Sequence, residues 1–141
     1  MAITLQQRNT TRAFARVIGP WLLIVPGVIV LRLPQMERLL AAFIASELFA
    51  WFAGALLLLC GLLIIALHQF WSSVSAVLIS LFGWFLALRG LVLLVAPQWI
   101  ERAATGLMGQ LLLVRLIFIG LFLIGLWLTV DGWILKPPTA D

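Results

Sequence analysis

Three charged residues stand inside or at the edge of long apolar stretches: Glu47, Arg89 and Arg115. An ionisable side chain at membrane depth is costly, so such residues usually mark a functional site or a charge pair. A carboxylate accepts two parallel hydrogen bonds from a guanidinium, and we therefore expect Glu47 to contact Arg89 or Arg115 between helices. The alternative is that both arginines extend to the lipid headgroups while Glu47 caps the start of its helix.

The other reactive side chains are isolated. Cys60 is the single cysteine and lies in the middle of an apolar stretch, and His68 is the single histidine. One thiol excludes a disulfide within the chain and a cysteine-based metal cluster, and one imidazole excludes a multi-histidine site within one chain. No nucleophile and base stand at a catalytic spacing. The sequence thus predicts neither an enzyme nor a bound metal or cofactor.

Four apolar stretches must position these side chains. Hydrophobic residues make up 65% of the 141 residues and charged residues 10%, far from the balance of a soluble domain. Each stretch is long enough, or nearly so, to cross the hydrocarbon core of a bilayer as a helix. We expect an all-α integral membrane protein, residues 1–141 forming one domain, with a bundle of four transmembrane helices. The stretches are Val17–Leu31, Leu48–Leu67, Val74–Val95 and Leu111–Val130.

Shorter segments connect and flank the four spans. Residues 1–12 are a polar N-terminal tail, and residues 134–141 are a proline-containing C-terminal tail. Two amphipathic segments precede the second and fourth spans: one opens at Pro34–Arg38 and runs into Leu39–Ser46, and the other is Ile100–Gln110. Such segments favour the plane of the membrane interface.

The first span has two features of its own. Pro20 and Pro26 lie inside it, and prolines within a membrane helix predict a kink or a break. Arg8, Arg12 and Arg16 precede it, as basic residues precede the apolar part of a signal peptide. No small-residue cleavage site follows, so we expect an uncleaved span.

Small residues recur at a spacing of four from the first amphipathic segment into the second span. In lipid, small residues on one helix face let two backbones approach closely and so drive helix association. The face could serve the bundle itself or a partner, and the sequence leaves this open. The helix-packing residues are Ala42, Ser46, Ala50 and Gly54, with Gly83 and Ala87 in the third span.

The chain contains an internal repeat. The unit is a span, a Pro-Gln turn, an amphipathic Glu-Arg segment and a second span, which gives residues 17–71 as repeat one and 74–133 as repeat two. Each unit crosses the membrane twice, so the sequence predicts two tandem helical hairpins of the same orientation, related by a pseudo-two-fold axis along the membrane normal. The matches at an offset of 63 are Trp21, Gly27, Pro34 and Gln35 with Trp84, Gly90, Pro97 and Gln98, and those at 64 are Glu37, Arg38 and Gly61 with Glu101, Arg102 and Gly125.

The second half resembles a known family. Leu88–Leu91, the turn Pro97–Trp99, Leu113–Arg115 and the glycines Gly120 and Gly125 are similar to the two-span YjeT-like bacterial inner-membrane proteins. The resemblance covers about a third of the chain and implies a helical hairpin and a bacterial inner membrane, not an activity. Members of that family commonly carry an acidic residue where this chain has Arg89, which is a departure from their pattern.

Composition and motifs favour a non-catalytic accessory or scaffold subunit of a membrane protein complex. The expected partners are membrane lipids and other integral membrane proteins, or a second copy of the chain, bound through helix faces. The alternative is a small transporter or channel with a polar path near Glu47, Arg89 and Arg115. The pI of 11.2 comes from nine dispersed Lys and Arg residues, and without a basic stripe it does not indicate nucleic-acid binding.

The two membrane faces carry nearly equal numbers of basic residues, so the positive-inside rule gives only a weak indication of orientation. Three arginines before the first span favour a cytoplasmic N-terminus by the positive-inside rule. The family resemblance favours the opposite orientation, because there the basic loop between the spans is cytoplasmic. We predict that both termini are cytoplasmic.

Overall fold

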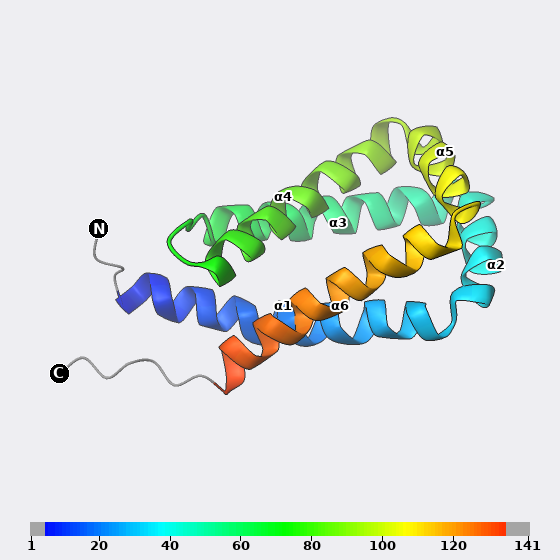
Figure 1. The fold of residues 1–141 in the computed structure, drawn as a ribbon. Helices are drawn as coiled ribbons and strands as arrows, with labels where there is room; N and C mark the ends of the chain where they lie inside the picture. Colours follow the sequence, from blue (N-terminus) through cyan, green and yellow to red (C-terminus); the bar gives the residue numbers. More distant parts are fainter. Residues whose placement is uncertain (1–4, 135–141) are drawn as a thin grey trace.

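The computed structural model describes residues 5–134, and every regular element in that part of the chain is an α-helix (Figure 1). Residues 135–141 of the C-terminal tail, with Lys136, and residues 1–4 of the N-terminal tail lie outside the described residues. The helices are α1 Leu5–Leu31, α2 Leu33–Ile44, α3 Glu47–Leu67, α4 Val74–Val95, α5 Pro97–Met108 and α6 Leu111–Trp133.

Four of these helices, α1, α3, α4 and α6, are long and apolar enough to cross a membrane. The chain is therefore an all-α multi-pass membrane protein, as the sequence predicted. Helix α1 starts at Leu5, so most of the expected polar tail is helical. The same helix runs unbroken through Pro20 and Pro26, so of the two alternatives expected there, a kink or a break, the break is not formed. A membrane helix tolerates proline where neighbouring groups satisfy the freed backbone carbonyls.

The spans associate as two antiparallel pairs, α1 with α6 and α3 with α4 (Figure 1). Helix α2 leads from the first pair to the second, and α5 leads back, so both are crossover connections at the same end of the molecule. The turn at residues 68–73 lies at the opposite end, beside the start of α1 and the end of α6. The expected tandem hairpins are therefore not formed, because α1 and α3 are joined by α2 but packed against different partners.

Glycines allow both pairs to pack at backbone distance. A Cβ added to Gly61 would meet the backbone of Ala87, and one added to Gly125 would meet the backbone of Leu22 and Leu23. At Gly19 an added Cβ would lie 2.6 Å from the amide nitrogen of Thr129. Because lipid tails are as apolar as the side chains, this close van der Waals packing is what holds membrane helices together.

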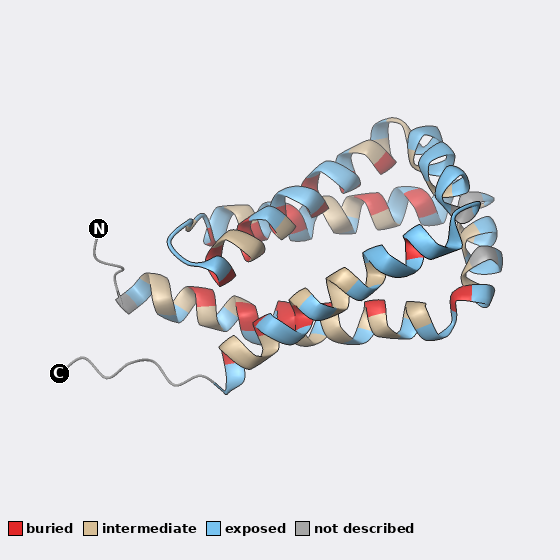
Figure 2. Cartoon of the chain, in the orientation of Figure 1, coloured by how far each residue is buried: buried red, intermediate tan, exposed pale blue. Residues whose placement is uncertain are grey.

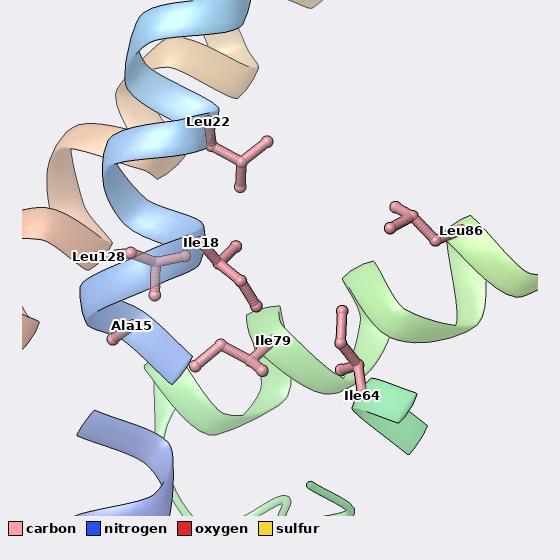
Figure 3. Packing of buried hydrophobic residues seen from close by; sticks show 7 residues of the cluster. All are labelled: Ala15, Ile18, Leu22, Ile64, Ile79, Leu86 and Leu128. Atoms are coloured by element: carbon pink, nitrogen blue, oxygen red, sulfur yellow. The ribbon is translucent and has the colours of Figure 1, made fainter. Parts of the chain in front are cut away.

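The two pairs meet through α1 and α4, where the buried core lies (Figure 3). The rings of Trp21 and Phe82 lie 5.8 Å apart across this contact. Ile79 and Leu128 are fully buried. Figure 2 shows buried residues along the facing sides of the helices and exposed residues on the outer sides. The core residues are Ala15, Ile18, Leu22, Ile64, Ile79, Leu86 and Leu128.

Candidate functional site

A large pocket opens at the end of the molecule that carries α2 and α5. It lies between the α3–α4 pair and the first half of α6, and its volume is about 1010 Å³. Apolar side chains form most of its wall, including Trp51, Leu93 and Phe118. We call it the crossover pocket, because both crossover helices contribute to it. Its polar wall consists of Glu47 from α3, Arg89 from α4, and Gln98 and Glu101 from α5.

The structure brings Glu47 and Arg89 to this one pocket but forms no ion pair between them. The helix register sets the separation of their backbones. A Cβ added to Gly90 would lie 2.7 Å from the carbonyl oxygen of Gly54, so Arg89 is nearly level with Gly54. Glu47 precedes Gly54 by seven residues, or about 10 Å along the axis. Glu47, Arg89 and Glu101 are all exposed, and all three contribute to the pocket wall.

The third predicted charge is separate. Arg115 is exposed on α6 and is not part of the pocket wall, although Val114 next to it is. Within the described residues, Arg115 forms no ion pair with Glu47. The pairing of Glu47 with an arginine is therefore not seen in this arrangement, and what the structure adds is Glu101 as a second carboxylate beside the same cavity.

The predicted small-residue face is divided by the end of a helix. Helix α2 ends at Ile44 and α3 begins at Glu47, so Ala42 and Ser46 do not continue the face of α3. Ala42 is exposed and Ser46 half-buried. The remaining members, Ala50, Gly54, Gly83 and Ala87, are buried between α3 and α4. The face thus serves packing inside the chain.

A buried polar cluster at the opposite end escaped the sequence analysis. His68, the first residue of the α3–α4 turn, is completely buried. Its Nε2 lies 3.0 Å from the hydroxyl of Thr11 on α1, and its Nδ1 lies 3.3 Å from the hydroxyl of Ser80 on α4. With the ring proton on Nδ1, Nδ1 donates to the Ser80 hydroxyl and Nε2 accepts from the Thr11 hydroxyl, so both nitrogens of the neutral ring are satisfied. The cluster joins α1 to the α3–α4 pair.

The surroundings of His68 favour its neutral form. The rings of Phe14 and Phe70 pack edge-on against the imidazole, with centroids 5.4 Å and 5.2 Å away. Burial lowers the pKa of His68 below its usual value, because the charged form is removed from water. The hydroxyl of Ser80, which accepts from Nδ1, donates its own proton to the carbonyl oxygen of Phe70 at 3.1 Å, and this fixes the turn. The His68 cluster therefore has a structural role.

Two arginines close the α1–α6 pair at the same end. The Nε atoms of Arg12 and Arg16 donate to the carbonyl oxygen of Gly132 at 3.0 Å and 2.9 Å. The indole of Trp133 donates back to the carbonyl oxygen of Arg16, and the Arg16 guanidinium lies 5.6 Å from the centre of that ring. Cations at the carbonyl end of a helix offset its dipole. These arginines therefore have a packing role between helices.

Comparison with known proteins does not identify a function for the crossover pocket. No protein family model, no curated protein and no solved structure matches this chain. Among the described residues no three His, Cys, Asp or Glu side chains are grouped to hold a metal ion. The crossover pocket is consequently the candidate site, with an apolar wall and charged groups of both signs.

Proposed function

We propose that this chain is a non-catalytic accessory subunit of a bacterial inner-membrane protein complex and that it binds a partner helix on the outer face of α6. The compartment is the one implied by the resemblance to the YjeT-like proteins. The proposal is supported by the distribution of buried residues. In the most apolar 18-residue window of each span, 17% of the α6 residues are buried against 39% in α4, so α6 has the smallest buried share of the four spans.

One glycine carries the proposal. Gly120 lies in the middle of α6, and a Cβ added there would meet nothing within 4 Å. The other glycines of the spans each have a heavy atom of another helix within 3.3 Å of such a Cβ. Glycine lowers the stability of a helix interior, and in membrane helices it is favoured where a second backbone approaches. The free space at Gly120 fits a helix from another protein.

The internal repeat belongs to the same proposal. Gly27 of α1 faces the ring of Phe122, and Gly90 of α4 faces the backbone of Leu58. Gly27 and Gly90 are 63 residues apart, and the residues they face, Leu58 and Phe122, are 64 apart. These are the two offsets of the sequence repeat. A pseudo-two-fold axis between α1 and α4 would exchange the two helix pairs. In such an arrangement α3 and α6 are the outer helices.

The transporter or channel reading has the crossover pocket in its favour. Against it, the core between the two pairs, which includes Ile18, Leu22 and Leu86, is apolar, so the polar groups of the pocket do not continue through it. The subunit reading accounts for both the filled centre and the free face at Gly120.

The test is purification of the full chain from native membrane in a mild detergent. The wild type should carry a stoichiometric larger partner, and Gly120→Leu should lose it while keeping the monomer's thermal stability, since leucine has the higher helix propensity. Cys60→Leu is the matched control, because Cys60 is an exposed small side chain on α3. If Gly120→Leu retains the partner as the control does, or if the wild type purifies only as a homo-oligomer that conducts ions, the proposal is wrong.

A further inference from the structure

Three charged groups face the crossover pocket without a partner in the chain. Glu47, Arg89 and Glu101 contribute to its wall, and none of them forms an ion pair in the described part of the chain. Charged groups at this depth are stabilised when they meet a counter-charge. A ligand with both a negative and a positive group would supply a counter-charge to the arginine and to the two glutamates.

We propose that the crossover pocket binds a zwitterionic phospholipid with a primary amine in its headgroup, of the phosphatidylethanolamine class. The phosphate would accept hydrogen bonds from the Arg89 guanidinium, which is suited to bidentate contact with phosphate. The ammonium has three N–H donors, and these would go to the carboxylates of Glu47 and Glu101. This inference is independent of the partner-binding face at Gly120, which is not part of the pocket wall.

The charge balance selects this headgroup over other membrane lipids. Two carboxylates and one guanidinium leave a net charge of −1 around the cavity. An anionic headgroup without an amine would satisfy Arg89 but be repelled by both glutamates. A quaternary ammonium has no N–H to donate, so a choline headgroup would have a weaker contact with the carboxylates than an ethanolamine headgroup.

The size and the polarity of the pocket fit an amphiphile. Its volume of about 1010 Å³ is at the upper end of the roughly 300–1,000 Å³ found for small-molecule sites, enough for a headgroup, the glycerol and the upper part of the acyl chains. Phe118 lies seven residues into α6, or about 10 Å from its start. Apolar contacts are thus available deeper in the pocket than the carboxylate of Glu47, which is at the first residue of α3.

The position of the pocket is that of a headgroup. The amphipathic helices α2 and α5 cross the ends of the spans there (Figure 1), and such helices lie at the membrane interface. Arg89 is six residues before the end of α4, or about 9 Å inward, and a long arginine side chain can extend toward the interface from that depth. A phosphate at the interface is within the range of such a side chain.

The experiment is lipid titration of the purified full chain, followed by native mass spectrometry. Phosphatidylethanolamine should bind about tenfold more tightly than phosphatidylglycerol with the same acyl chains, which is the range that charge-assisted hydrogen bonds supply. The double variant Glu47→Gln, Glu101→Gln should remove this preference. Arg89→Gln should weaken the binding of both lipids. Asp131→Asn, a carboxylate outside the pocket, is the control and should leave the titration unchanged.

Several results would overturn the assignment. These are equal binding of the two lipids to the wild type, a preference that survives the double glutamine variant, or a chain that retains no lipid and whose pocket is filled by a protein partner. Circular dichroism checks that each variant is helical. The comparison of the two lipids on the wild type decides the question even if a variant fails to insert.

Discussion

At the scale of single residues, the candidate site and the His68 cluster differ in how far their polar groups are enclosed. The carboxylates and the guanidinium of the crossover pocket are open to a ligand, whereas the imidazole and hydroxyls at the other end are enclosed and mutually satisfied. A buried polar group without a partner costs more than its hydrogen bond contributes. The His68 cluster is therefore sensitive to any change in its protonation.

We predict that stability falls as the pH falls below about 6.5, the ordinary pKa of histidine. Burial lowers the pKa of His68 in the folded protein, so the unfolded chain binds the proton first. The stability is complete above the unfolded pKa and is lost on acidification, with a slope of at most about 1.4 kcal/mol per pH unit for one proton.

Thermal unfolding in detergent between pH 7.5 and pH 5.5 measures this effect. His68→Gln removes the titrating group, and its midpoint should vary less across the same range than that of the wild type. A wild-type midpoint that rises toward acid pH, or an equal slope in both proteins, would show that His68 is not the group responsible.

At the scale of the helices, the spans follow from the sequence, but their pairing does not. The four apolar stretches and both amphipathic segments could be predicted from hydropathy alone, because length and composition suffice to define a membrane span. Leucine-rich faces are nearly equivalent to one another, so nothing local indicated that α1 packs against α6. The His68 cluster depends on how the two pairs meet, since its partner Thr11 comes from α1 and its partner Ser80 from α4.

The same limit applies to the candidate site. Glu47 and Arg89 were identified because charges in apolar stretches are rare, and the structure brings both to the crossover pocket. Glu101 was missed as a site residue, because on the sequence it belongs to an ordinary amphipathic segment. Whether Glu47 lies beside Arg89 depends on the α3–α4 register, which close approaches such as that of Gly54 to Gly90 define in the structure.

We predict that Gly54→Ile destabilises the α3–α4 pair by about 1–3 kcal/mol, the usual cost of overpacking. A Cβ at Gly54 would lie 3.0 Å from the Cβ of Leu93 and 3.1 Å from the carbonyl oxygen of Gly90. Membrane insertion should be unaffected, because isoleucine is more hydrophobic than glycine.

Thermal unfolding of the purified variants is the appropriate measurement. Leu56→Ile is the matched control, since Leu56 is 46% exposed on the outer side of the same helix and should leave the midpoint unchanged. A Gly54→Ile midpoint equal to that of the wild type would mean that the close approach of α3 and α4 is not needed for stability.

At the scale of the whole molecule, the two ends have different characters. One end carries α2, α5 and the crossover pocket. The other carries the α3–α4 turn, the His68 cluster and the two arginines that bind the Gly132 carbonyl oxygen. Which end faces the cytoplasm decides the leaflet from which the pocket would take its lipid.

We predict that the end with Arg8, Arg12 and Arg16 faces the cytoplasm, because positive charge before the first span is usually retained on that side. In a Cys60→Ser background, Asn9→Cys should resist a membrane-impermeant thiol reagent added to intact spheroplasts. Gly106→Cys on α5, where an added Cβ meets nothing within 4 Å, should be labelled. The reverse pattern would establish the opposite orientation.

The pairing of α1 with α6 has a consequence for synthesis of the chain. Leu31, the last residue of α1, and Leu111, the first of α6, are 80 positions apart. At roughly 5–20 residues per second, α1 is in the bilayer for about 4–16 s before its partner emerges from the ribosome. During that interval α6 has not been made. The backbone around Gly19 has no helix to pack against, and the side chains of Arg12 and Arg16 have no Gly132 carbonyl oxygen to which they can donate. An insertase or a membrane chaperone that shields α1 during this interval would determine the yield of the protein.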